Sequence, residues 1–314
     1  MLLHYLKVAV RQLLKYRTQN LISIVGLGVC LLCFSICLYV GRFILSTDRC
    51  FEKRDRIANI ELLREDGTPF GAGCIPLAHH LAAQLPAGVE AVTYVNPGDK
   101  RDYTVVLASG EELPFQNLDV LEADTCFHHV FGGELLAGSW EAAARTRNAV
   151  ILTERMARRL FAQPAEAIGR TMLLTNARRM MTAREAGVTG DVSYTVQAVI
   201  RDLPANNSLT RMKPVDLLTV NDELSYHEAF RQADYLLSGQ ICALLRPGFT
   251  PDRLNDTFLQ QDLKMTFGPN ECPVAARPFG GEFLSEGGYL IFTIIFLALG
   301  TLILLVGLLN FFNF

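Results

Sequence analysis

The sequence predicts an α+β extracytoplasmic domain between two transmembrane α-helices, and three observations lead to this fold class. Residues 18–41 carry no charge, and neither do residues 287–314. Each stretch contains the twenty or so apolar residues that a membrane-spanning helix needs. The sequence between them is polar and mixes strand-like and helix-like periods without a regular βαβ alternation, which is typical of an α+β domain.

Composition and charge agree with a membrane protein. Of the 314 residues, 50% are hydrophobic and 19% are charged, whereas an ordinary soluble domain has about 25% charged residues. Residues 1–44 carry five positive charges and no acid, so the rest of the chain carries −8 within a net charge of −3. Basic residues beside a span remain on the cytoplasmic side, so we expect the N-terminus inside and the domain outside.

These features divide the chain into four expected parts. Residues 1–19 have the spacing of an amphipathic helix at the cytoplasmic membrane surface. Residues 20–44 form the first transmembrane helix, residues 45–286 the outward domain, and residues 287–314 the second transmembrane helix. A cleaved signal peptide is disfavoured because its apolar core would be shorter and would end at a small-residue cleavage site.

Elements of the first half of the domain follow from their periods. In PLAHHLAAQL, the residues Leu77, Leu81 and Leu85 lie four apart between two prolines, which predicts a short amphipathic helix. The segments VEAVTYV and YTVVLAS are rich in β-branched and aromatic residues and predict strands. The second of them leads through Ser-Gly to ELPFQNLDVL, its expected hairpin partner.

The second half alternates in the same way. LTERMARRLF predicts a helix with Thr153 as its N-cap, and SYTVQAVIRDLP is the clearest strand because apolar residues alternate from Tyr194 to Ile200. VDLLTV and QICALLRPG are further strands. The latter precedes a helix capped by Thr250 with Pro251 at its first position. TNARRMMTAREAGVTGD is expected to be a basic loop.

The cysteines and histidines predict no catalytic or metal site. Five of the eight cysteines lie outside the first span, an odd and scattered set that leaves one or two disulfides open without indicating a framework. No His-x-x-x-His pair occurs, and no Cys-x-x-Cys outside the membrane, so ligands do not converge on one helix face. We therefore expect a protein that is not an enzyme, without cofactor or bound metal.

Small residues follow one face of each expected span. Close approach of helices in lipid depends on such residues, so both spans are predicted to pack against other helices. In the first span the spacings are four, three, four and four, and in the second they are seven, with a polar residue on nearly the same face. The helix-packing candidates are Gly26, Cys30, Cys33, Cys37 and Gly41 in the first span, and Thr293, Gly300, Gly307 and Asn310 in the second.

Two functions are disfavoured by absent motifs. The nearest string to a phosphate-binding loop, AIGRT, has Arg170 where the loop needs lysine and lacks the upstream glycine, so any ATP hydrolysis would come from another chain. Nucleic-acid binding would require more basic charge than the few residues beside the first span.

Several blocks together resemble one family, the MacB/FtsX-like permeases of ABC transporters. The opening LKVAVRQLLKYRTQNLISIVGLGVCLL is similar to that family's entry into its first span, and STDRCFEKRDRI to the pair of motifs behind it. VLEADTCFHHVFGGELLAGSW, NAVILTERMARRLFAQPAEAIGRTMLL and YTVQAVIRDLPANNSL resemble three later blocks in the same order. LVGLLNFFNF resembles the end of the second span.

The resemblance implies a function for the whole assembly. It implies a permease subunit in the bacterial inner membrane that couples ATP hydrolysis by a separate ABC ATPase subunit to movement of a periplasmic core domain, in export or mechanotransmission. The partners expected are membrane lipid, the ATPase, a second permease copy, which the small-residue faces favour, and a periplasmic protein. Because the family continues beyond this point with a coupling segment and further spans, the chain is expected to be an N-terminal fragment.

Two other classes of function stay open at this point. A two-span membrane sensor with a periplasmic ligand-binding domain has the same layout, and the reading frame beyond Phe314 would distinguish it from a permease. An anchored extracellular enzyme is the third class, disfavoured because no nucleophile, carboxylate pair or metal set is apparent. The cargo is not indicated by the sequence.

Overall fold

The computed structural model describes residues 15, 17–98, 100–107, 109–177, 190–210, 212–221, 239–267, 270–280 and 288–312. The chain divides into two compact units, one made of residues 1–47 and 283–314 and the other of residues 48–282. Most of the expected N-terminal surface helix and of the basic loop after Thr175 lies outside the described residues.

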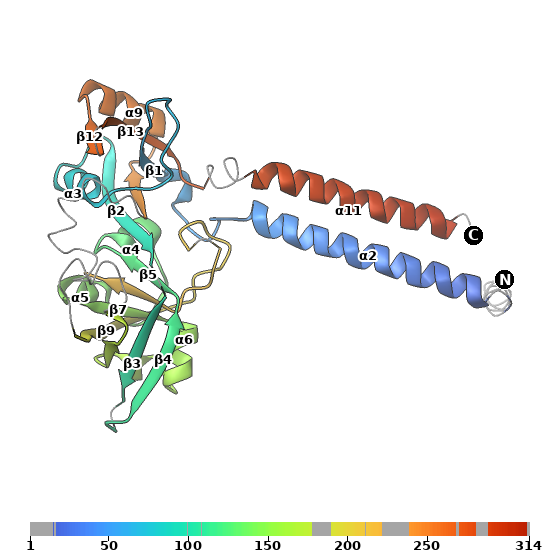
Figure 1. Ribbon diagram of the computed structural model, residues 1–314, viewed down its shortest axis with the longest axis horizontal. Coiled ribbons are helices and arrows are strands. Elements are labelled where there is room, and N and C mark those ends of the chain that lie inside the picture. Colours follow the sequence, from blue (N-terminus) through green and yellow to red (C-terminus); the bar gives the residue numbers. More distant parts are fainter. Residues whose placement is uncertain are drawn as a thin grey trace. The chain divides into compact units, whose positions relative to one another are not determined.

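The first unit is a pair of antiparallel helices, α2 (Arg17–Leu45) and α11 (Tyr289–Phe312), which lie side by side in Figure 1. Both are long and apolar enough to cross a membrane, over Leu21–Leu45 and Tyr289–Phe312. Their outer faces expose large apolar side chains, such as Tyr39 at 70% and Phe312 at 77%. Exposure on that scale suits a lipid environment.

The second unit is built on one mixed sheet of thirteen described strands. Their order is β12-β13-β1-β11-β2-β5-β10-β7-β9-β8-β3-β4, and β6 pairs with β9 beside this path. The pairs β5–β10 and β7–β9 are parallel and the other described pairs are antiparallel. The strands are β1 (Ile57–Leu62), β2 (Val89–Pro97), β3 (Arg101–Val106), β4 (Glu112–Leu118), β5 (Val120–Ala123), β6 (Leu135–Gly138), β7 (Ala149–Thr153), β8 (Thr171–Leu174), β9 (Val192–Ile200), β10 (Leu217–Val220), β11 (Gln240–Leu245), β12 (Lys264–Phe267) and β13 (Asn270–Pro278).

Short helices cover the sheet at separate places along it (Figure 1). Three of them begin with side-chain caps, in which the hydroxyls of Ser139, Thr153 and Thr250 accept hydrogen bonds from backbone N–H groups of the first turn. Such a bond satisfies a donor that the helix itself leaves free. The helices are α3 (Ile75–Ala83), α4 (Phe127–Phe131), α5 (Trp140–Arg145), α6 (Glu154–Leu160) and α9 (Pro251–Gln260), with 3-10 turns η1 (Arg54–Arg56) and η2 (Pro164–Ala167).

Three apolar clusters form the core of this domain. One packs α3 and α9 against the β1, β2, β11 and β13 strands, another packs α6 against β7, β8 and β9, and the third lies between them around α4. The prediction of an α+β domain is confirmed, and every segment predicted as a strand overlaps one. The predicted first helix ends at Ala83, so Leu85 lies outside it and is 48% exposed.

Candidate functional site

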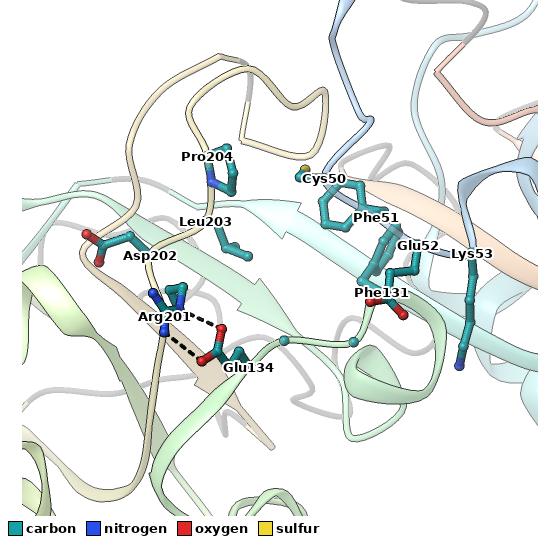
Figure 2. A pocket seen from close by; sticks show the side chains of 12 residues that line it. Cys50, Phe51, Glu52, Lys53, Phe131, Glu134, Arg201, Asp202, Leu203 and Pro204 are labelled. Carbon is teal, nitrogen blue, oxygen red and sulfur yellow. Dashed lines mark hydrogen bonds and ion pairs between the residues drawn. The ribbon is translucent and has the colours of Figure 1, made fainter.

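A cleft of the domain lies beside the segment that follows α2. It has a volume of about 580 Å³ and is lined by three segments, residues 50–53, 131–134 and 201–204. Figure 2 shows the first segment on one side, the last on the other, and residues 131–134 along the base. The three segments are far apart in sequence and are brought together by α4 and by the β6–β9 pair.

Three aromatic rings pack together beside the cleft, and two of them, Phe51 and Phe131, line it. Phe51 packs against Phe131 with ring centroids 4.9 Å apart and against Phe279 at 6.0 Å, and Phe131 and Phe279 are 5.4 Å apart. All three side chains are buried. Phe51 follows α2 by a few residues, and Phe279 comes directly after β13 on the way to α11. The two segments that lead to the apolar helices therefore meet in one cluster.

Asp48 adds a polar tie beside these rings. Its Oδ1 accepts a hydrogen bond from the Ser208 N–H at 2.7 Å, and its own backbone N–H donates to the carbonyl of Asn206 at 3.1 Å. Burial raises the pKa of this carboxyl, while the bonds from Ser208 and the charge of Arg54 oppose that shift. The segment after α2 is thus bound to the loop that follows β9.

Gly280 leaves room for this carboxylate. A Cβ on Gly280 would lie 2.8 Å from Oδ2 of Asp48, closer than side-chain atoms approach one another, and the backbone has φ +76°, a region that favours glycine. The residue just past β13 is therefore adapted to contact with Asp48. A side chain at this position would push apart the segments that lead to α2 and α11.

An exposed ion pair closes the opposite end of the cleft. Arg201 and Glu134 face each other with Nε–Oε2 and Nη2–Oε1 distances of 2.6 Å, and the Arg201 N–H donates to the Glu134 carbonyl. Figure 2 shows both side-chain bonds. The hydrogen bond from Arg201 lowers the pKa of Glu134, and the bond to Glu134 raises the pKa of Arg201. The pair joins the start of β6 to the end of β9, so it holds the loops on which the cleft depends.

Two further polar side chains of the cleft form hydrogen bonds with the backbone, and a third, Cys50, is a protonated thiol. Asp202 accepts from the Arg155 N–H at the start of α6 at 2.9 Å, and the Lys53 ammonium donates to the carbonyl of His129 at 2.7 Å. Burial and the nearby Asp48 charge raise the pKa of the Cys50 thiol to about 11, which keeps it protonated and poorly nucleophilic at neutral pH. Among the described residues, no group of three or more His, Cys, Asp or Glu side chains is placed to hold a metal ion.

The small residues singled out in the spans mostly face the other helix of the pair. A Cβ on Gly300 would lie 2.7 Å from Cβ of Cys37, and one on Gly307 would lie 2.7 Å from Cβ of Cys30. A Cβ on Gly41 would lie 2.8 Å from the Leu297 side chain. These residues let α2 and α11 approach each other closely within one chain, so their spacing gives no support for a second copy.

The other candidates in the spans are placed differently. A Cβ on Gly26 would have no neighbour within 4 Å in the described part of the chain, and Cys33 is half-buried. Thr293 is buried, but Asn310, which the spacing put on nearly the same face, is exposed. The eight cysteines are all free, so the one or two disulfides that the sequence left open are not formed in this structure.

The sequence did not single out the residues that form the cleft. Asp48 and Phe51 stand in the quoted string STDRCFEKRDRI, Phe131 in VLEADTCFHHVFGGELLAGSW, and Arg201 in YTVQAVIRDLPANNSL. The order of these blocks was the available signal. That order indicated a fold, but the contact between the blocks could be seen only in the structure.

Comparison with known proteins identifies the domain. The family model of the MacB-like periplasmic core domain matches residues 21–260, well over half of the chain. The chain belongs to this family. The resemblance to MacB/FtsX-like permeases is confirmed, and the MacB-like domain, flanked by two apolar helices, makes this a membrane protein with an extracytoplasmic domain.

Solved structures are similar to this chain at low sequence identity. A domain described as part of a permease from Porphyromonas gingivalis is 20% identical, with a TM-score of 0.54, covering 73% of this chain and 93% of that one. The periplasmic region of MacB from Actinobacillus actinomycetemcomitans is 13% identical, with a TM-score of 0.46, covering 77% of this chain and 96% of that one. A comparison with curated proteins finds no match.

Proposed function

We propose that this MacB-like chain transmits movement between the membrane and its periplasmic core domain, driven by a separate ABC ATPase subunit. The observation that carries the proposal is the aromatic cluster of Phe51, Phe131 and Phe279, in which the segments behind α2 and ahead of α11 meet. Closely packed side chains transmit strain to one another. A displacement of either helix should therefore be transmitted to α4 and to the cleft through these ring contacts.

Family membership supports the expected surroundings. The proposal places the chain in the bacterial inner membrane with the basic N-terminal residues in the cytoplasm and the core domain in the periplasm, as the charge distribution favours. Its partners are then lipid around α2 and α11, the ATPase, a second permease copy and a periplasmic protein. The second copy rests on the family alone, since the small residues of the spans face each other.

The proposal gives the chain a conformational rather than an enzymatic role. The cleft contains a protonated Cys50 thiol, a Glu134–Arg201 pair engaged with itself, and Asp202 engaged with α6. These groups stabilise loops, and a nucleophile beside a general base is not among them. The absence of hydrolase activity toward ester, peptide and phosphoester substrates is the matching biochemical expectation.

A substitution that loosens the aromatic cluster tests the coupling between the helices and the core domain. We would reconstitute the full-length product of the gene with the ABC ATPase from the same source and follow Trp140, the single tryptophan of residues 1–314, as ATP is added, with any later tryptophan replaced by phenylalanine. Trp140 contacts Phe127, which packs on Phe131, so movement of the cluster should change its emission. Phe51→Leu keeps an apolar side chain at this position but removes the packing between the rings. It should reduce the ATP-dependent change in Trp140 emission at least about threefold while the ATPase still binds.

The matched control is Phe258→Leu. Phe258 is as deeply buried as Phe51 but belongs to the cluster around α3 and α9, so it has the same chemistry and a similar cost of about 1 kcal/mol. It should leave the ATP-dependent signal intact. Equal signals from the two variants would refute the proposed coupling. Failure of the ATPase to bind the wild-type full-length protein would also refute it and would favour a sensor.

A further inference from the structure

Asp48, which begins the unit formed by residues 48–282, is held in a strained conformation. Its φ is +63°, in the left-handed region where residues other than glycine are uncommon, although aspartate and asparagine tolerate it better than most. The side chain is 1% exposed, and burial of a charged group is unfavourable. A strained backbone and a buried carboxylate persist together only where the surrounding contacts fix them. The contacts of Asp48 therefore indicate what this residue does.

These contacts join Asp48 to the loop that follows β9, residues 201–210. The backbone N–H of Asp48 donates to the carbonyl of Asn206 at 3.1 Å, and its Oδ1 accepts from the Ser208 N–H at 2.7 Å. On the other side, a Cβ on Gly280 would lie 2.8 Å from Oδ2. Asp48 is therefore in contact with this loop and with the segment that leads to α11.

Hydrogen bonds within the loop connect this contact to the cleft. Asn207 is fully buried, and its side chain accepts from the Thr210 N–H at 3.0 Å and donates to the carbonyl of Pro204. Pro204 lines the cleft of Figure 2. Asn207 stands in sequence between the two residues that Asp48 contacts, and it is bonded directly to Pro204. A displacement of Asp48 should therefore be transmitted to that wall of the cleft.

This path differs from the one through the aromatic cluster. The rings lead to residues 131–134 at the base of the cleft, whereas Asp48 leads to residues 201–204 on the side opposite the segment behind α2. An ion pair and the packing of Leu203 on the apolar cluster also join base and wall. Loss of the polar path should therefore reduce the movement of that wall without abolishing it.

From these contacts we propose that Asp48 is a positioning residue, which transmits movement of the spans to the loop of residues 201–210 and so moves one wall of the cleft relative to its base. The inference rests on the proposed coupling function and adds a second, polar path to it. The path requires an oxygen of residue 48 as the acceptor for the Ser208 N–H. An amide oxygen at the same place satisfies this requirement.

The test follows the two paths separately in the full-length product of the gene, reconstituted with its ABC ATPase. Trp140 emission reports on the aromatic cluster, and an environment-sensitive dye attached to Ala205→Cys reports on the loop. The exposed Cys50 and the half-buried Cys126 are replaced by serine, as is any later cysteine, and any later tryptophan is replaced by phenylalanine. With Asp48 in place, both signals should change when ATP is added.

Two substitutions separate the side chain of Asp48 from its backbone. Asp48→Gly removes the carboxylate without strain at positive φ, and the loss of the bond to Ser208 should reduce the ATP-dependent dye signal at least about threefold while the Trp140 signal remains. Asp48→Asn keeps an acceptor oxygen and tolerates the same φ, so it should retain most of the dye signal. Without ATP, hydrogen exchange of the Ser208 N–H should be at least about tenfold faster in the glycine variant only.

The matched control is Asp262→Gly. Asp262 also has a positive φ, +48°, and its exposed carboxylate pairs with Lys264 at 2.8 Å outside the residues that line the cleft, so this variant should keep both signals. The inference is overturned if Asp48→Gly leaves the dye signal or the Ser208 exchange unchanged, if it reduces both optical signals equally, or if Asp48→Asn behaves like the glycine variant. A Trp140 response to ATP without a dye response overturns this inference alone, whereas the absence of both responses refutes the proposed function with it.

Discussion

At the scale of single residues, Asp124 is a carboxyl of the core domain whose pKa is strongly shifted. It lies between β5 and α4 and accepts hydrogen bonds from the Thr93 hydroxyl, the Tyr94 N–H at 2.8 Å and the Cys126 N–H at 2.9 Å. Burial nevertheless outweighs these bonds and raises its pKa to about 6 from 3.8. A carboxyl whose pKa is raised in the folded protein makes folding more favourable when it is protonated.

This shift predicts a pH dependence with a definite sign. Between pH 3.8 and about 6 the folded protein binds more protons at Asp124 than the unfolded chain does, so stability falls as pH rises through this window, by about 3 kcal/mol in full. Asp124→Asn cannot titrate and should lack this component. We expect the melting temperature of the wild type, relative to the variant, to decrease from pH 4.5 to 7 when Trp140 fluorescence is followed. A difference that stays constant with pH would contradict the assignment.

At the scale of elements, local signals predicted what lies within one segment. The N-caps at Thr153 and Thr250, and the alternation from Tyr194 to Ile200, depend on neighbours in sequence, and the structure has each of them. The cleft depends on segments separated by many residues, and no local period links Phe51 to Phe279. Strand order is set by such long-range contacts, which explains why the sequence predicted strands but not their neighbours.

The helix pair α2–α11 shows the same limit. The spacing of small residues indicated helix packing, yet it did not say whether the partner helix belongs to the same chain. The close approach of Gly307 to Cys30 and of Gly300 to Cys37 gives the answer for this structure, an antiparallel pair within one chain. Packing of small residues then stabilises the hairpin of spans by direct van der Waals contact.

Cysteine cross-linking tests this register. In a chain whose Cys33 and Cys37 are replaced by serine, Gly307→Cys should form a disulfide with Cys30 on mild oxidation, because the Cβ positions are 2.7 Å apart and a small separation brings them into disulfide range. Cleavage of the domain between the spans would leave the two fragments joined until reduction. In the control, cysteine is moved from position 30 to Gly28, which has no neighbour within 4 Å. Equal cross-linking from both positions would contradict the register.

At the scale of the whole molecule, the orientation of the chain in the membrane can be tested at one exposed position before the first span and one in the core domain. Lys15 precedes α2, which begins at Arg17, and α9 carries Leu259, which is 76% exposed. Native cysteines are poor reporters because Cys242 is fully buried and Cys126 half-buried. Introduced cysteines at exposed positions avoid that problem.

We predict that Leu259→Cys, in a chain whose exposed Cys50 is replaced by serine, reacts with a membrane-impermeant maleimide in intact cells with a permeabilised outer membrane. Lys15→Cys in the same background should react only after the inner membrane is lysed, because the basic residues beside the first span hold that end in the cytoplasm. A denatured sample of each variant gives the total reactive thiol and serves as the control for burial. The reverse pattern would place the core domain in the cytoplasm and would contradict the proposed transmission of movement to a periplasmic domain.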